Sequence, residues 1–321
     1  MTNSNEKKLL IKIAHMYYEQ DMTQSQISKE LGIYRTTISR MLKKSREEGI
    51  VKIIINYDAG NNEAIENELK KRFDLKEAIV VPIDSDQPKH LRLNAIGQAC
   101  ASLLERINRE DDMIGFSWGS SLAAVVEALR LQDKKQNILC VPLIGGPAGK
   151  LDTQYHVNTI CYQASLKLNG KSLMIDVPAV MEQKEIRDAI MESNYFKMFA
   201  DVWKNISIAV FGIGSLEISE TSTWLNFYGR ETTRKLKKSH VTGDICSQFF
   251  DINGKRIQTS ISDRTIAMDL NQIKKVRYSI GVAESPEKVS GIIGALNGRY
   301  MNTLVTTEET AREILNQTED K

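Results

Sequence analysis

From residue 77 to the C-terminus, short apolar runs alternate regularly with stretches of helical periodicity, and this alternation most constrains the fold. The predicted strands are residues 77–81, 112–116, 137–143, 171–175, 206–212, 277–282 and 303–306. The predicted helices are residues 91–107, 121–131, 155–167, 184–203, 286–296 and 308–316. Strands and helices in this order predict an α/β fold with a doubly wound, Rossmann-like sheet.

The residues before this alternation divide into a linker and a separate N-terminal segment. Residues 57–76 begin with polar side chains and continue with apolar ones at helical spacing, which predicts a linker leading into a helix. A chain of 321 residues has room for two domains. We therefore expect one domain at residues 1–56 and a second at residues 57–321.

Composition excludes several classes of protein. Hydrophobic residues make up 41% and charged residues 26% of the chain, a balance typical of globular proteins. The four cysteines are far apart without a CxxC pair, which argues against a zinc module or a disulfide scaffold. The N-terminus is too charged for a signal peptide, and no apolar stretch approaches the ~20 residues that span a bilayer. We expect a cytoplasmic protein with no membrane contact, no cofactor and no metal.

The N-terminal segment has the pattern of a helix-turn-helix. Residues 7–18 carry apolar side chains on one helical face. Thr23, with Gln26 three positions later, predicts a capping box at the start of a short second helix. Gly32 predicts the end of that helix, because glycine adopts the left-handed backbone at little cost. A longer third helix is predicted over residues 34–48, which completes the pattern of a DNA-binding head.

The third predicted helix carries the strongest indication of a nucleic-acid partner. Between Tyr34 and Arg46 there are five Lys or Arg residues and no acidic one. Residues 1–56 hold ten Lys and Arg against six Asp and Glu, whereas the remainder is mildly acidic. The residues predicted to contact DNA are Thr23, Gln24, Tyr34, Arg35, Thr36, Thr37, Ser39, Arg40 and Lys43. The alternative is a solvated basic face on an ordinary helical bundle.

The chemistry of these side chains suits DNA. Arginine can donate two hydrogen bonds to guanine, and hydroxyl groups at a helix start commonly hold phosphate. After Gly49, the β-branched residues 50–55 predict a strand. Such a strand would serve as the wing of a winged-type helix-turn-helix or as the start of the connection.

Three glycine-containing loops that follow predicted strands indicate a ligand pocket. In a doubly wound sheet, ligands bind where strands end and helices begin. The loops span residues 115–121, 144–150 and 211–215, and they fit neither a Walker A loop nor a dinucleotide fingerprint. Together with Lys288, at the start of a later helix, they predict a pocket for a phosphate or a polyol. The alternative is that the loops are ordinary turns and that Lys288 is an exposed lysine.

Over nearly its whole length the sequence resembles the SorC family of bacterial sugar-responsive transcription regulators. The segments that carry the resemblance are YYEQDMTQSQISKELGIYRTTISRMLKK, IGFSWG, VPLIGGPAGK, YHVNT, FGIGS, GDICSQFFD and KVSGIIGALNGRYMNTLVTTEETA. The resemblance implies an N-terminal DNA-binding domain and a C-terminal effector domain related to sugar-phosphate isomerases and glucosamine-phosphate deaminases. It also implies a homotetramer that binds operator DNA as pairs of dimers, with a sugar or phosphosugar changing the affinity.

The same resemblance implies where the effector binds. The implied effector-binding residues are Ser117, Gly119, Ser120, Ser121, Gly145, Gly146, Asp244 and Lys288. Many members have Gly-Gly before the matching lysine, whereas residues 284–287 of this chain are Glu-Ser-Pro-Glu, and many have Thr where Ser121 stands. The charges of Glu284 and Glu287 beside Lys288 favour an unphosphorylated sugar. The likeness is strongest to regulators of sorbose operons, which implies sorbose or sorbose 1-phosphate as the effector.

The likeness to isomerases raises the alternative of a sugar-phosphate isomerase or deaminase. Isomerisation of a sugar needs a base near the C1–C2 protons and a partner that shuttles the second proton. Of the four histidines, His156 is the one that could reach the pocket, and it is included among the predicted effector-binding residues. No acid–base pair is visible, and a fold alone does not supply an activity. We therefore expect a regulator rather than an enzyme.

Overall fold

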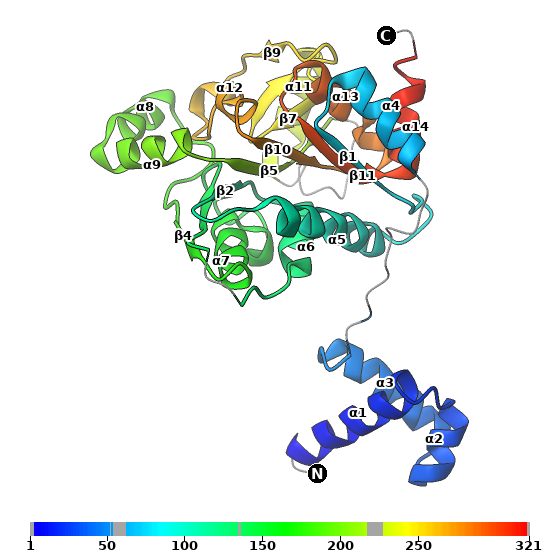
Figure 1. The fold of residues 1–321 in the computed structure, drawn as a ribbon. Coiled ribbons are helices and arrows are strands. Elements are labelled where there is room, and N and C mark those ends of the chain that lie inside the picture. Colours follow the sequence, from blue (N-terminus) through cyan, green and yellow to red (C-terminus); the bar gives the residue numbers. More distant parts are fainter. Residues whose placement is uncertain (1–2, 52, 54–61, 134–135, 217–226, 320–321) are drawn as a thin grey trace. The chain divides into compact units, whose positions relative to one another are not determined.

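The structure is a computed structural model that describes residues 3–51, 53, 62–133, 136–216 and 227–319. The chain divides into two compact units, Met1–Asn56 and Tyr57–Lys321 (Figure 1). None of the helices in the described ranges is both long enough and apolar enough to cross a lipid bilayer.

The N-terminal unit is built from three helices, α1 (Asn3–Tyr18), α2 (Gln24–Leu31) and α3 (Arg35–Glu47). Apolar side chains from all three helices pack into one small core, and each of them is at most 3% exposed. These core residues are Ile13, Met16, Ile27, Ile38 and Leu42. The helices lie where the apolar spacing predicts them, because one face of each is needed to form this core.

The predicted capping box at the start of α2 is present. The Gln26 backbone N–H donates to Thr23 Oγ1 at 3.3 Å, and the Thr23 backbone N–H donates to Gln26 Oε1 at 2.8 Å. Gly32 follows the helix with φ 65°, the left-handed conformation that glycine adopts without strain. Local sequence therefore sets both ends of this helix.

The described residues among 50–55 do not form the predicted strand. Ile50, Val51 and Ile53 are described and belong to no strand. Residues 52, 54 and 55 lie outside the described part of the chain. The wing that this strand would form stays a prediction.

The C-terminal unit contains a seven-stranded, parallel sheet with the order β1-β11-β10-β5-β2-β3-β4. Its strands are β1 (Glu77–Val81), β2 (Met113–Phe116), β3 (Leu139–Pro142), β4 (Lys171–Ser172), β5 (Ile208–Gly212), β10 (Tyr278–Val282) and β11 (Thr303–Thr307). All seven predicted strands are present in this sheet. The chain proceeds outward from β2 to β4 and then returns to β5 at the centre, so the direction of winding changes between β2 and β5. Ligands bind at such switch points in open α/β sheets.

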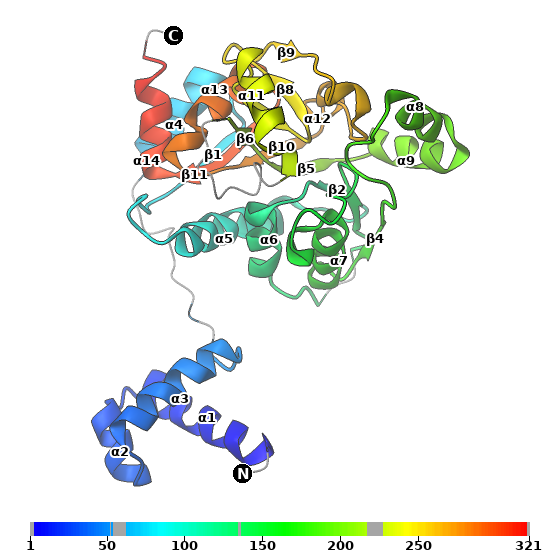
Figure 2. The ribbon, with the colours of Figure 1, turned by 180° about the vertical axis from the view of Figure 1, so that it is seen from behind.

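Helices cover both faces of this sheet, as Figures 1 and 2 show. α5, α6 and α7 lie on one face, whereas α4, α13 and α14 lie on the other. The helices of this unit are α4 (Glu63–Phe73), α5 (Lys89–Ile107), α6 (Ser120–Ala128), α7 (Val157–Lys167), α8 (Lys184–Glu192), α9 (Asn194–Lys204), α11 (Arg230–Lys238), α12 (Leu270–Ile273), α13 (Val289–Asn297) and α14 (Glu308–Asn316). Short 3₁₀ helices span η2 (Thr153–Tyr155), η3 (Ser262–Arg264) and η4 (Pro286–Lys288).

The single helix predicted over residues 184–203 is wrong, because the structure has two helices there. α8 ends at Glu192, and α9 begins at Asn194. Between them, Ser193 has an extended backbone, and its hydroxyl accepts a hydrogen bond from the Phe196 N–H at 3.2 Å. Serine can cap a new helix in this way, and the cap competes with continuation of the previous one.

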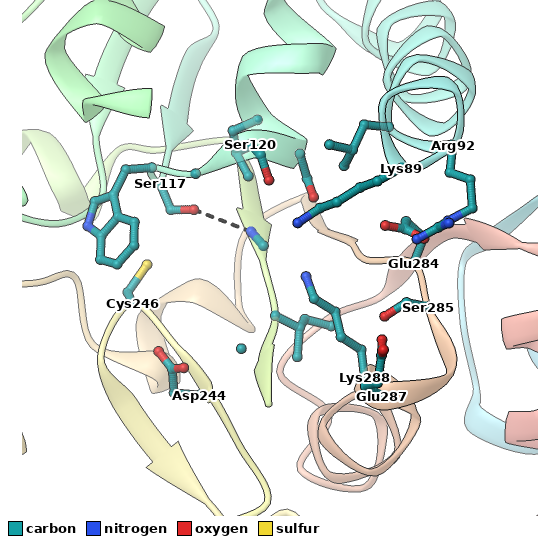
Figure 3. A pocket seen from close by; sticks show the side chains of 18 of the residues that line it. Lys89, Arg92, Ser117, Ser120, Asp244, Cys246, Glu284, Ser285, Glu287 and Lys288 are labelled. Carbon is teal, nitrogen blue, oxygen red and sulfur yellow. Dashed lines mark hydrogen bonds and ion pairs between the residues drawn. The ribbon is translucent and has the colours of Figure 1, made fainter. Parts of the chain in front are cut away.

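A second, four-stranded antiparallel sheet was not predicted. Its strands are β6 (Gly214–Ser215), β7 (Gly243–Ile245), β8 (Gln248–Phe250) and β9 (Arg256–Ile257), in that order. Each strand has two or three residues, which is too short for a period of two to be recognised in the sequence. Its central hairpin, β7–β8, brings further side chains to the carboxyl end of the large sheet (Figure 3).

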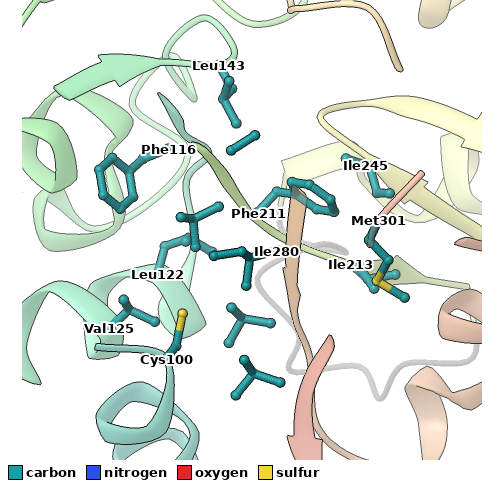
Figure 4. Close-up of a cluster of buried hydrophobic side chains, with 14 of the residues drawn as sticks. Cys100, Phe116, Leu122, Val125, Leu143, Phe211, Ile213, Ile245, Ile280 and Met301 are labelled. Carbon is teal, nitrogen blue, oxygen red and sulfur yellow. The ribbon is translucent and has the colours of Figure 1, made fainter. Parts of the chain in front are cut away.

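The core of the C-terminal unit lies between the large sheet and its helices (Figure 4). Phe116 at the end of β2 and Phe211 near the end of β5 are fully buried, and Leu122 of α6 packs with them in the same cluster. This packing holds the ends of the two central strands and the start of α6 together. A cavity lies at those ends.

Candidate functional site

A cavity opens at the carboxyl ends of the central strands, at the point where the winding changes direction. Its volume is about 230 Å³. Small-molecule sites usually span roughly 300–1,000 Å³, so this cavity suits a compact ligand. Six segments line it: the start of α5, the segment from β2 into α6, Ile144 after β3, the segment from the end of β5 to the start of β6, the turn after β10 with η4, and the β7–β8 hairpin (Figure 3).

Six of the predicted effector-binding residues line this cavity together. They are Ser117, Gly119, Ser120, Ser121, Asp244 and Lys288. Because their segments are far apart in sequence, their meeting is a consequence of the parallel sheet and of the hairpin beside it. The three loops predicted to form the pocket contribute further lining residues: Trp118, Ile144, Gly212, Ile213 and Gly214. The lining residues that the sequence analysis did not assign to the site are Lys89, Arg92, Leu93, Leu122, Cys246, Ser247, Glu284, Ser285 and Glu287.

The loop between β2 and α6 presents the start of a helix to the cavity. Gly119 precedes α6 with φ 125°, a backbone conformation that residues other than glycine rarely adopt. No side chain caps this helix. The first N–H groups of a helix without a side-chain cap can donate to a polar or anionic ligand group. The Ser117 hydroxyl accepts a hydrogen bond from the Gly212 N–H at 3.3 Å and so joins the ends of β2 and β5.

Charges of opposite sign balance around the cavity. The cationic lining residues are Lys89, Arg92 and Lys288, and the anionic ones are Asp244, Glu284 and Glu287. Arg92 Nε lies 2.7 Å from Glu284 Oε2, and the side chains of Arg92 and Glu284 are only 14% and 5% exposed. The expectation that Glu284 opposes a phosphate beside Lys288 therefore needs correction, since Arg92 offsets the charge of Glu284.

Two ammonium groups face each other across the cavity. Figure 3 shows Lys89 of α5 and Lys288 of η4 extending toward one another, with Ser120 nearby. Burial lowers the pKa of Lys288, and the positive charge of Lys89 acts in the same direction. Both lysines can donate hydrogen bonds to oxygen atoms of a ligand placed between them.

The tip of the β7–β8 hairpin forms another wall of the cavity. Cys246 and Ser247 both have positive φ angles, 52° and 59°, as a tight two-residue hairpin turn requires. Asp244 Oδ2 accepts a hydrogen bond from the Ser247 N–H at 3.0 Å and supports this turn. Burial raises the pKa of the Cys246 thiol, which keeps it protonated. Among the described residues, no three His, Cys, Asp or Glu side chains are grouped so that they could hold a metal ion.

Three predicted effector-binding residues, Gly145, Gly146 and His156, do not line this cavity. A Cβ on Gly145 would lie 2.5 Å from the Pro178 carbonyl oxygen, and one on Gly146 would lie 2.8 Å from His156 Nε2. These glycines permit close packing of a neighbouring segment. His156 caps α7, because its Nδ1 accepts a hydrogen bond from the Asn158 N–H at 3.1 Å. Burial lowers the pKa of His156, which favours the neutral ring that this acceptor role needs.

In the N-terminal unit, most of the predicted DNA-contacting side chains are exposed along α3 and at its start. Tyr34 is 85% exposed, and Thr37 is half-buried. In the described part of the chain, neither Arg35 nor Arg40 takes part in an ion pair, whereas Lys44 lies 2.5 Å from Glu6. The exposed members on this helix and its first cap position are Tyr34, Arg35, Thr36, Ser39, Arg40 and Lys43. Thr23 and Gln24 lie at the start of α2, where Thr23 is part of the capping box.

Comparison with known proteins shows extensive similarity. Residues 57–316 match a family described as "Putative sugar-binding domain". The chain is 48% identical to the sorbitol operon regulator of Klebsiella pneumoniae, over 98% of this chain and 100% of that protein. It is 29% identical to the deoxyribonucleoside regulator of Bacillus subtilis, over 97% of this chain and 98% of that protein.

Solved structures show the same fold. The crystal structure of the full-length sorbitol operon regulator SorC from Klebsiella pneumoniae superposes with a TM-score of 0.78, at 47% identity, covering 96% of this chain and 98% of that one. A probable sor operon regulator from Shigella flexneri superposes with a TM-score of 0.74, at 44% identity, covering 79% of this chain and 100% of that one.

Proposed function

The chain belongs to the SorC family of sugar-responsive transcription regulators, and from this premise we propose that it controls a sugar-utilisation operon. In this proposal the N-terminal unit binds operator DNA. A sugar or sugar phosphate binds in the cavity of the C-terminal unit and changes the affinity for the operator.

The observation that carries the proposal is the cavity at the switch point of the sheet. It combines serine hydroxyls, two facing lysines and carboxylates, with an uncapped helix start beside them. Sugars present many hydroxyl groups, each of which needs donors and acceptors at fixed places. The proposed effector-binding residues are Ser117, Gly119, Ser120, Ser121, Asp244 and Lys288, and Lys89 joins them. Gly145, Gly146 and His156 are left out, because they do not line the cavity.

The proposed effector is a six-carbon sugar or sugar alcohol. The resemblance implies sorbose or sorbose 1-phosphate, whereas the Klebsiella relative is named for sorbitol. The balanced charges of the cavity are compatible with a neutral ligand, and the two facing lysines would also accommodate a phosphate. Sorbose, sorbitol and sorbose 1-phosphate are therefore the three ligands to compare.

We assign recognition of operator DNA to α3 and the segment before it. Its exposed face carries Arg35 and Arg40 without acidic partners among the described residues, together with the hydroxyls of Thr36 and Ser39. Helices of this kind lie in the major groove, with arginines at base edges and hydroxyls at phosphates. The site of action is then the bacterial cytoplasm, where operator DNA is found.

If a sugar controls DNA binding, it has to change how the N-terminal units of several subunits are arranged. We propose a homotetramer that contacts two or more half-sites, which must lie one helical turn of DNA apart or a multiple of it. A small rotation between subunits then changes how well the N-terminal units match the spacing of the half-sites. A coupling free energy of about 1–3 kcal/mol gives a 5- to 150-fold change in affinity.

The proposal is tested by fluorescence anisotropy of the full-length protein on DNA from upstream of its own operon. The titration is done in excess competitor DNA at fixed salt, without ligand and with sorbose, sorbitol or sorbose 1-phosphate. Competitor-resistant binding that shifts with one of the three is expected, and that ligand is then the effector. Binding that no ligand changes would leave only the DNA-binding part of the proposal standing.

Failure to bind above competitor DNA would favour the isomerase or deaminase alternative. Assays for interconversion of sugar phosphates would then follow. His156, the histidine considered as a base, caps α7 and does not line the cavity, so that alternative has to place its acid and base among the cavity's carboxylates and lysines.

A further inference from the structure

Ser285 has an unusual backbone conformation at the wall of the cavity. Its φ is 106° and its ψ is 147°. Residues with a Cβ rarely adopt this region, which glycine occupies freely. The chain thus carries a side chain at a position where glycine would be less strained, and strain of this kind clusters at binding sites.

The backbone around Ser285 is held from several sides, which explains how the strain persists. The Ser285 N–H donates to Thr310 Oγ1 at 3.1 Å, and the Lys288 N–H donates to the Ser285 carbonyl oxygen at 3.1 Å. The Ser215 hydroxyl donates to the Glu287 carbonyl oxygen at 2.7 Å. These contacts fix the turn and with it the direction in which the Ser285 side chain projects.

The Ser285 hydroxyl has no hydrogen-bond partner among the described residues. Although it stands at the N-cap position of η4, it makes no capping hydrogen bond. Within the described chain it neither donates nor accepts any other hydrogen bond. Figure 3 shows this side chain at the cavity wall between Glu284 and Lys288, with its oxygen directed into the cavity.

We propose that Ser285 is a specificity-determining residue whose hydroxyl binds a hydroxyl group of the effector. This inference rests on the proposed function, since it assumes that a sugar occupies the cavity. A sugar hydroxyl both donates and accepts hydrogen bonds, and a serine hydroxyl can accept from it or donate to it. Glu287 lies two positions after Ser285 and also lines the cavity, and its charge favours a neutral hydroxyl over an anionic group at this wall.

The test compares Ser285→Ala with Ser285→Gly in the full-length protein. Both variants remove the hydroxyl, but only Ser285→Gly also removes the backbone strain. Ligand affinity is measured by isothermal titration calorimetry with sorbose, sorbitol and sorbose 1-phosphate, and Tm is measured without ligand. Ser102→Ala, at an exposed position on α5 outside the cavity lining, is the matched control.

Both Ser285 variants should weaken binding of the effector about fivefold, the typical effect of one lost neutral hydrogen bond. Ser285→Gly should also raise the Tm of the C-terminal unit by about 2–4 °C, whereas Ser285→Ala should not. In a series of deoxy analogues of the effector, loss of one particular hydroxyl should weaken binding to the wild type but not to Ser285→Ala.

Three outcomes count against the inference, and they can be told apart. If the wild type binds an effector and Ser285→Ala binds it equally well, the role of Ser285 is overturned while the proposed function stands. If Ser285→Gly leaves Tm unchanged or lowers it, the strain argument is wrong. If the wild type binds none of the ligands, the proposed function fails and the inference fails with it.

Discussion

At the scale of single residues, one arginine changes the electrostatic interpretation of the cavity. Arg92 lies in the first turns of α5, and Glu284 lies in the turn after β10, so their sequence positions are far apart. In the structure they form an ion pair, and Arg92 also donates to the carbonyl oxygens of Ser85 and Gln87 at 3.0 and 2.7 Å. Glu284, four positions before Lys288, is therefore not an unpaired negative charge in the cavity.

Also at this scale, Arg35→Ala and Arg40→Ala should each weaken binding to the operator by about 5- to 150-fold. The reason is that loss of an arginine at a base edge costs about 1–3 kcal/mol of binding free energy. The measurement is anisotropy at one fixed salt concentration, because phosphate contacts make affinity depend on salt. Lys12→Ala, exposed on α1, is the control. Unchanged operator affinity in both arginine variants would contradict the assignment of α3 to DNA recognition.

At the scale of secondary-structure elements, helix ends follow local chemistry where a capping side chain is present. Thr23 begins α2 and Ser193 begins α9, each by accepting a backbone hydrogen bond. The first of these caps was predicted, because its partner Gln26 completes a recognisable motif. The second was missed, because apolar residues continue on both sides of Ser193 and suggest one unbroken helix.

The Thr23 cap leads to a prediction about the stability of α2. Thr23→Ala should destabilise the start of this helix by about 1 kcal/mol, since it leaves a helix N–H without its partner. Amide hydrogen exchange of α2 in the full-length protein should become roughly fivefold faster. Ser25→Ala, one position inside the same helix and exposed, should have little effect. Equal exchange rates in Thr23→Ala and the wild type would show that the cap contributes nothing.

At the scale of the whole molecule, the cavity belongs to one unit of the chain. Every residue that lines it lies between Lys89 and Lys288, within the unit Tyr57–Lys321. The loops that line it come from strands on both sides of the switch point and from the small antiparallel sheet. This placement supports the proposed division of labour, in which the C-terminal unit binds the ligand and the N-terminal unit binds the DNA.

A fragment of residues 57–321 should therefore bind the effector with an affinity within about twofold of that of the full chain, because no lining residue is lost. Calorimetry measures this affinity. The fragment should also form the same oligomer as the full chain, as judged by light scattering, and should not bind operator DNA. A fragment that loses both sugar binding and self-association would contradict the proposed division.

The sequence by itself determined which segments form the strands of the large sheet and the three helices of the N-terminal unit. These features depend on local periodicity and on short-range motifs such as the Thr23 capping box. It also indicated part of the cavity, because the ends of parallel strands meet at one edge of a sheet. Ser117, Ser121 and Lys288 were found in this way or through the family resemblance.

Only the tertiary structure decided which side chains meet across the cavity. It brought Lys89 toward Lys288, paired Arg92 with Glu284 and left Gly145 and Gly146 outside the cavity lining, against Pro178 and His156. It also revealed the positive φ of Ser285. The physical reason is that such contacts join residues far apart in the chain. They are set by the order in which the strands pair, and local periodicity does not encode that order.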